Sequence, residues 1–186
     1  MKTEKIRALI KNAEGKGINL SNSSLTGVDL SNLDLTGVNL SNSDLSNVNF
    51  ENAILNNANF SKSDLSKALF KNIVSGNTNF EKSDLSEVVG IENLFAPNNN
   101  LSGAIFQIVD LSNKDLTGIN MSRCNLRNVN FSNAFLPSAN FSNSNLQNAN
   151  FSDADLSNTN FEKSDLRNAS FHGAITKNAN FSKSDI

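Results

Sequence analysis

The sequence predicts an all-β solenoid made of square coils and preceded by a short helix. Two periods carry this prediction: a bulky apolar residue returns every fifth position, and the motif Ser-Asp-Leu returns every twentieth. The five-residue period is clearest in the last third of the chain. Its apolar residues there are Phe131, Leu136, Phe141, Leu146, Phe151, Leu156, Phe161, Leu166, Phe171 and Phe181, and Thr176 is the one gap.

A five-residue period fits neither a helix nor a straight strand. On a helix it would rotate the apolar side chains around the whole cylinder. On a strand, an odd period would send alternate apolar side chains to opposite faces. A chain that turns a corner every five residues can point all of these central residues inward. Residues that tolerate the positive φ of a tight corner follow two positions after the centres: Asn22, Gly27, Asn32, Gly37, Asn42, Asn47, Asn52 and Asn57.

The twenty-residue period sets the length of one coil. Ser-Asp-Leu occurs at 43–45, 63–65 and 83–85, then at 164–166, and Ser-Asp-Ile follows at 184–186. Four units of five residues therefore make one square coil. Phe and Leu alternate as centres in the last third, so we expect Phe to face Phe within a coil. Equal residues should also stack between coils, as in the columns Phe131/Phe151/Phe171 and Phe141/Phe161/Phe181.

Residues 1–16 form a separate element, which we expect to be a helix that caps the solenoid of residues 17–186. Ile6, Leu9, Ile10 and Ala13 recur at helical spacing, with Thr3 as N-cap and Gly15 and Gly17 as stop signals. A helix this short is marginal alone, which favours a lid on the first coil. A partner-binding helix is the alternative.

The single solenoid domain is interrupted by an irregular loop near 86–110, where the alternation is lost. The interval from Leu85 to Leu126 is 41 residues, one more than two coils, so a single extra residue should be absorbed there. The column Leu45/Leu65/Leu85 should then continue as Leu126/Leu146/Leu166. Loops often carry function, and a tolerated insertion is the alternative interpretation.

These units resemble the pentapeptide-repeat family, whose consensus is A(D/N)LXX. Residues 58–62, Ala-Asn-Phe-Ser-Lys, and 154–158, Ala-Asp-Leu-Ser-Asn, fit that consensus closely, and the match covers about residues 18–88 and 101–186. The resemblance implies a right-handed quadrilateral β-helix, and it alone supplies the handedness. One branch of the family, the Qnr- and MfpA-like proteins, binds type II topoisomerases such as DNA gyrase, resembles duplex DNA and protects its targets from quinolones.

Composition and motifs give little support to catalysis or to cofactor binding. The net charge of −2 provides no basic surface for direct nucleic-acid binding. The single cysteine, Cys124, should be a small inward residue, and the single histidine, His172, lies at a corner. Asp44, Asp64 and Asp84 form a column that could hold a cation, although nearby lysines offset it. We therefore expect no enzyme, no cofactor and no metal, in a cytoplasmic protein without a membrane span.

Apolar residues at outward positions are the non-generic feature of the surface. The position before each centre is usually Asn or Asp, but several are apolar. Those in the first half should gather on two adjoining faces, and this suggests a contact site or, alternatively, a surface covered by the 86–110 loop. The candidate interaction residues are Ile54, Leu69, Val74, Val89, Leu94, Phe95 and Phe135, and Ile175 shares the pattern.

These observations favour a non-enzymatic scaffold that binds another protein. Binding of gyrase or another topoisomerase is the alternative, although a DNA mimic needs one negative charge per ~1.7 Å and the net charge is only −2. A homodimer is also expected, through the coil that contains Phe181 and Ile186, because no covering helix follows it.

Overall fold

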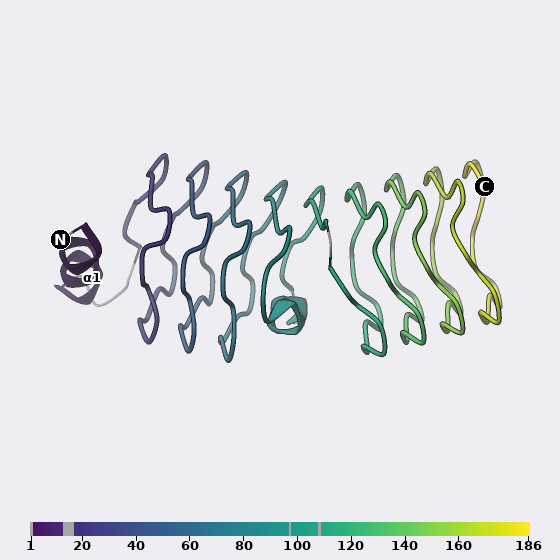
Figure 1. The fold of residues 1–186 in the computed structure, drawn as a ribbon, viewed down its shortest axis with the longest axis horizontal. Helices are drawn as coiled ribbons and strands as arrows, with labels where there is room; N and C mark the ends of the chain where they lie inside the picture. The colour runs from purple at the N-terminus through teal and green to yellow at the C-terminus, as the bar shows by residue number, and fades with distance from the viewer. Residues whose placement is uncertain (1, 13–16, 97, 108) are drawn as a thin grey trace. The chain divides into compact units, whose positions relative to one another are not determined.

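The computed structural model describes residues 2–12, 17–96, 98–107 and 109–186. The chain forms two compact units, Met1–Asn100 and Leu101–Ile186. Unit 1 contains the α-helix α1 (Lys2–Asn12) and the 3₁₀ helix η1 (Ile91–Phe95). Figure 1 shows successive coils within each unit, with η1 in teal on unit 1.

Single parallel bridges hold each coil to the next, and they join the residues that precede the centres. Asp44 pairs with Asp64 and Asp64 with Asp84, and in unit 2 Asn140 pairs with Asn160. The partners are 20 residues apart throughout the described residues, with one exception: Asn79 pairs with Asn100, 21 residues on. The pairing therefore confirms the coil length, and it places one extra residue between Asn79 and Asn100.

The corners have the backbone conformation that their residues predict. The eight Asn and Gly residues named above have φ between 54° and 70°. Lys62, Lys82, Lys163 and Lys183 occupy the same corner position with φ of 57–60°. Corner amides also pair between coils, as in the 2.9 Å hydrogen bond from Asn42 N to Ser61 O. The repeated bond helps a left-handed conformation that costs a non-glycine residue free energy.

The core of each unit is a set of stacked central residues. Phe131 and Phe151 stack with ring centroids 4.9 Å apart, and Phe141 and Phe161 do so at 5.4 Å. Within a coil the opposed rings meet edge to face, as Phe151 and Phe161 do at 5.5 Å. Edge-to-face and offset-stacked pairs are both favourable arrangements of aromatic rings. The expected columns of Phe are thus confirmed.

Some of the small inward residues between the centres bury hydroxyl groups that share one kind of partner. Ser63 Oγ donates to Leu40 O at 2.7 Å, and Ser144 Oγ donates to Met121 O at 2.7 Å. In both cases the acceptor belongs to a central residue of the preceding coil. These bonds remove the cost of burying an unpaired polar group.

Helix α1 lies against the first coil, in the position expected for a lid. Arg7 donates to Asp29 O at 3.1 Å and to Ser31 O at 3.0 Å, and Ile10 is buried. Two expectations are wrong here. Thr3 is inside the helix, which begins at Lys2, and Leu9 is 49 % exposed, because at 3.6 residues per turn it points about 100° away from Ile10. Ala13 and Gly15 lie outside the described residues.

Candidate interaction site

Four apolar side chains form two neighbouring ladders in unit 1. Ile54 pairs with Val74 on one ladder, and Leu69 pairs with Val89 on the next. Ile54 is 37 % exposed, Val74 54 % and Val89 47 %, while Leu69 is half-buried. We call these four residues the unit 1 patch. The structure thus brings together the residues that their outward positions single out.

The other two ladders of unit 1 are polar. One is a continuous Asn ladder, in which Asn39 Nδ2 donates to Asn19 Oδ1 and Asn59 Nδ2 to Asn39 Oδ1, each at 3.2 Å. The other contains the Asp44/Asp64/Asp84 column. A side chain of the unit 1 patch cannot make such ladder bonds, so its apolar character brings the local backbone no evident benefit.

The segment after Val89 departs from the square coil and corrects the placement of Leu94. Gly90, with φ of 84°, leads into η1, and η1 buries Ile91 and Leu94. Leu94 is completely buried, so the expectation that it extends the outward Ile54/Val74 ladder is wrong. The 3₁₀ helix replaces the straight side and turns this residue into the core. Phe95, the last residue of η1, is half-buried.

The irregular segment is also shorter than the 86–110 range expected. Bridges still form at Val89, resume at Asn100, and continue in unit 2 at Ile105 and Asp110. Within the described residues, only the stretch between Val89 and Asn100 lacks the bridges of the coil. The apolar ladders therefore stay exposed beside this short segment, since the exposures of Val74 and Val89 are measured with η1 in place.

One side chain, Asn99, fastens this segment to the preceding coil. Its Nδ2 donates to Ser75 Oγ and to Leu94 O, both at 3.0 Å, and its Oδ1 accepts from Thr78 N at 2.9 Å. Ser75 Oγ in turn donates to Asn93 O at 2.9 Å. Sequence reasoning missed both Asn99 and Ser75. The available signal was Ser75, a polar residue at a central position.

Unit 2 carries a different arrangement, in which acidic and apolar residues alternate on one ladder. Asp115 pairs with Phe135, Phe135 with Asp155, and Asp155 with Ile175. Phe135 is 48 % exposed and Ile175 56 %. Phe135 is thus separate from the unit 1 patch, and its neighbours along the ladder are carboxylates.

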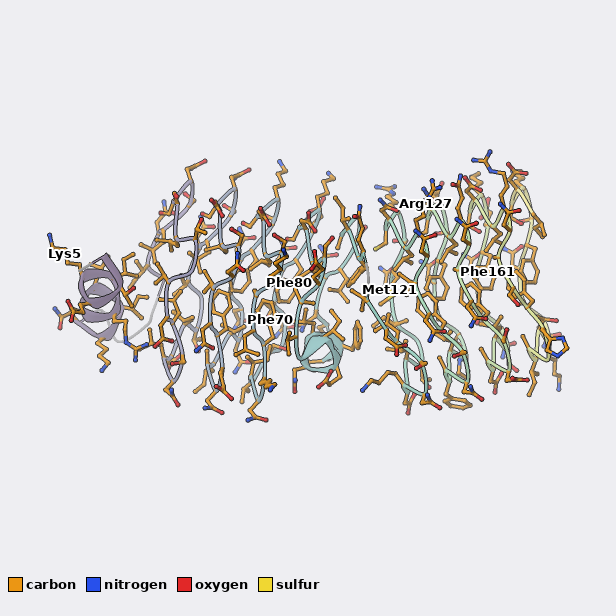
Figure 2. All side chains as sticks on the ribbon, viewed as in Figure 1. Lys5, Phe70, Phe80, Met121, Arg127 and Phe161 are labelled. Carbon is orange, nitrogen blue, oxygen red and sulfur yellow. The ribbon has the colours of Figure 1, made fainter. Side chains whose placement is uncertain are left out.

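Another face of unit 2 holds a polar network. Arg127 donates to Gln147 Oε1 at 2.8 Å, Gln147 donates to Asp165 Oδ2 at 2.6 Å, and Arg167 binds both oxygens of Asp165. The Arg167 hydrogen bond, followed by that from Gln147, holds the pKa of Asp165 below its usual range. Figure 2 shows Arg127 at the outside of the coils and Phe161 within them. These groups satisfy one another.

The groups that could support chemistry are dispersed. Cys124 is buried, its Sγ lies 3.0 Å from Leu101 O, and burial raises the pKa of its thiol to about 12. His172 is exposed at its corner. Among the described residues no three His, Cys, Asp or Glu side chains gather as a metal site would require. In the same residues no helix has the length and apolar character needed to cross a membrane.

The terminal coil exposes part of its apolar core. Phe181 is half-buried, although it stacks on Phe161 at 5.0 Å, and Ile186 is 73 % exposed.

Comparison with known proteins identifies the repeat. The family model for pentapeptide repeats matches the chain in eight copies, over residues 11–42, 34–72, 104–143, 124–162 and 136–173, which is more than half of its length. The chain belongs to the pentapeptide repeat family. Among curated protein sequences no significant match is found.

Solved structures of pentapeptide repeat proteins resemble this one. HetL of the cyanobacterium Nostoc, a protein involved in the regulation of heterocyst differentiation, is 25 % identical with a TM-score of 0.57, and the match covers 95 % of this chain and 94 % of HetL. A trypsin-treated variant of QnrB1, a plasmid-mediated fluoroquinolone resistance protein, is 24 % identical over 89 % of this chain and 83 % of that one, with a TM-score of 0.39.

Proposed function

We propose that this pentapeptide repeat protein is a non-enzymatic scaffold that binds another protein through the unit 1 patch and the adjoining η1 segment. Its coils are wound as a right-handed quadrilateral β-helix, a proposal supported by the 20-residue pairing and by family membership. The observation that carries the function is the exposure of Ile54, Val74 and Val89 on adjoining ladders.

Exposed apolar ladders have a cost that polar ladders avoid. Clustered apolar side chains on a soluble surface favour association, and such patches commonly mark contact sites. Asn at these positions would fit the coil, as Asn39, Asn59 and Asn79 demonstrate on the Asn ladder. The apolar residues are therefore better explained by a partner than by the fold.

The test compares the intact chain with a double variant, Ile54→Asn with Val74→Asn. Partners captured from the native organism are purified and their affinity for both proteins is measured by calorimetry. We expect the variant to fold normally and to bind about ten-fold more weakly or worse, which corresponds to ~1.4 kcal/mol. The matched control is Ile175→Asn, the same kind of change on a unit 2 ladder. Equal affinities of all three proteins would refute the proposal.

A topoisomerase remains the named alternative partner, and the same experiment addresses it. Purified gyrase subunits serve as a directed arm, in binding and in protection from a quinolone. Binding that is lost in the double variant would identify gyrase as the partner of the unit 1 patch. Binding that ignores the patch but disappears when Asp44, Asp64 and Asp84 are changed to Asn would favour DNA mimicry instead.

Self-association through the coil of Phe181 and Ile186 is a further proposal, supported by the 73 % exposure of Ile186. Sedimentation of the intact chain and of Ile186→Lys should show an oligomer at high micromolar concentration only for the former. A monomer in both cases would exclude this contact.

A further inference from the structure

We propose that the unit 2 ladder Asp115–Phe135–Asp155–Ile175 binds an arginine side chain of an extended peptide, with the guanidinium on the Phe135 ring between the two carboxylates. This site is separate from the unit 1 patch, so the proposal does not depend on the function assigned to that patch. Its occupant is defined by the chemistry of four residues on one ladder.

The backbone fixes the spacing of these groups. Phe135 N donates to Lys114 O at 2.9 Å, and Asp155 N donates to Ala134 O at 3.0 Å, so the positions are locked in register. Adjacent bridge positions in a ladder lie about 4.8 Å apart. Each carboxylate is therefore one step from Phe135, on opposite sides of it. This order places an exposed aromatic ring between two negative charges.

The two carboxylates keep a free oxygen each toward solvent. Thr117 N and Oγ1 both donate to Oδ1 of Asp115, and Ser157 N donates to Oδ1 of Asp155. Within the described residues no hydrogen bond reaches Oδ2 of either group, and no ion pair joins them to Lys114 or Lys177. The backbone contacts hold the carboxylates in place, and their charge remains unneutralised.

A guanidinium suits this arrangement better than other groups do. Aromatic faces attract cations within about 6 Å of the ring centroid, most often arginine. The planar guanidinium stacks on a ring and still donates at its edge to carboxylates on either side. An anion would be repelled by Asp115 and Asp155, and a purely apolar segment would leave both carboxylates beside its surface. Charge complementarity therefore selects a basic ligand.

Ile175 adds a second requirement for the ligand. It lies two ladder steps from Phe135, about 9.6 Å, and three residues of an extended peptide span about 10 Å. An apolar side chain three residues from the arginine would therefore reach Ile175, which is 56 % exposed. The preferred sequence is arginine followed or preceded, three residues away, by a leucine-like residue.

The test is an amide chemical-shift titration of the intact, isotope-labelled chain with the peptide acetyl-Gly-Arg-Gly-Gly-Leu-Gly-amide. We expect shifts at the amides of Asp115, Phe135, Asp155 and Ile175. Phe135→Asn and the pair Asp115→Asn with Asp155→Asn should each weaken binding about five-fold or more. Phe135→Leu separates aromatic from apolar contact, and it should also weaken binding. The amide spectrum of each variant reports whether the coils are intact.

Two controls decide between this site and simpler causes. The same peptide with citrulline, a neutral analogue of arginine, should cause no shifts. The ladder of Asp64 and Asp84 in unit 1 has adjacent carboxylates without an aromatic ring, and the Asp64→Asn, Asp84→Asn variant should bind as the unchanged chain does. The proposal is overturned if citrulline binds equally, if Phe135→Leu binds normally, if shifts spread equally to Asp64 and Asp84, or if the ladder amides shift with protein concentration alone.

Discussion

The Phe70 carbonyl carbon lies 2.8 Å from the point where a Cβ on Gly90 would stand, and Lys71 N lies 2.9 Å from it. Gly90 also has a φ of 84°. The chain thus passes against the backbone of the preceding coil just where it leaves the square path for η1. Both the close approach and the positive φ require glycine at this position.

Replacing Gly90 by alanine is expected to destabilise unit 1 by roughly 3 kcal/mol, because backbone atoms of Phe70 and Lys71 cannot move away cheaply. The matched control is Gly27→Ala. Gly27 has a similar φ of 66° with nothing within 4 Å of an added Cβ, so it should lose only about 1 kcal/mol. Urea unfolding followed by circular dichroism measures both variants. Equal losses would mean that the contact with Phe70 has no energetic weight.

Removing the Asn99 side chain should loosen η1. Asn99→Ala deletes three hydrogen bonds and leaves Thr78 N without its acceptor, so we expect a loss of roughly 2–4 kcal/mol. Asn99→Asp retains the acceptor for Thr78 N and loses the two donor bonds, and it should fall between alanine and the unchanged chain. Hydrogen exchange of the amides in 91–95 should accelerate in the same order. Unchanged exchange in Asn99→Ala would show that buried Ile91 and Leu94 hold the helix alone.

The regular coils could be predicted from the sequence because every unit repeats the same physical problem. Each centre must be bulky, as Phe151 is, and each corner must accept positive φ, as Asn57 does. Two observations, the period of five and the period of twenty, therefore determine which residues pair. The outward positions of Ile54, Val74 and Phe135 followed from the same rule, without any knowledge of the tertiary structure.

The break could not be predicted in the same way, because no repeat constrains it. The count of residues required one extra position, but it did not show that η1 would form or that Leu94 would turn inward. That outcome depends on contacts between distant residues, such as Asn99 with Ser75, and on space left at a central position occupied by serine. The alternation of Asp115, Phe135 and Asp155 was visible in the sequence once the ladder was known.

The Phe columns lead to a graded prediction. Phe151 stacks on Phe131 at 4.9 Å and on Phe171 at 5.3 Å, and it is fully buried, whereas Phe181 stacks only on Phe161 and is half-buried. Phe151→Ala should therefore cost about 4 kcal/mol, and Phe181→Ala about half of that. Thermal unfolding of the two variants tests this order. A larger loss for Phe181→Ala would indicate that the terminal coil is covered, for example by a second copy.

The thiol of Cys124 links stability to alkaline pH. Its pKa rises from 9.0 to about 12 because burial penalises the thiolate. Below pH 9 the thiol is protonated in both the folded and the unfolded state, so it adds no pH dependence. Between pH 9 and 12 the unfolded chain loses this proton and the folded chain keeps it, so the free energy of unfolding falls as pH rises, by up to about 1.4 kcal/mol per pH unit.

The measurement compares the unchanged chain with Cys124→Ser, under reducing conditions, by urea unfolding between pH 8 and 10.5. Serine occupies the next position of this column, where Ser144 Oγ donates to Met121 O at 2.7 Å, and the introduced hydroxyl could donate to Leu101 O in the same way. The variant should therefore be within about 1 kcal/mol of the unchanged chain at pH 8. Above pH 9 the difference should shift in favour of the variant, because serine has no proton to lose. A difference independent of pH, or rapid labelling of native Cys124 by a thiol reagent at pH 8, would show that the thiol is open to solvent.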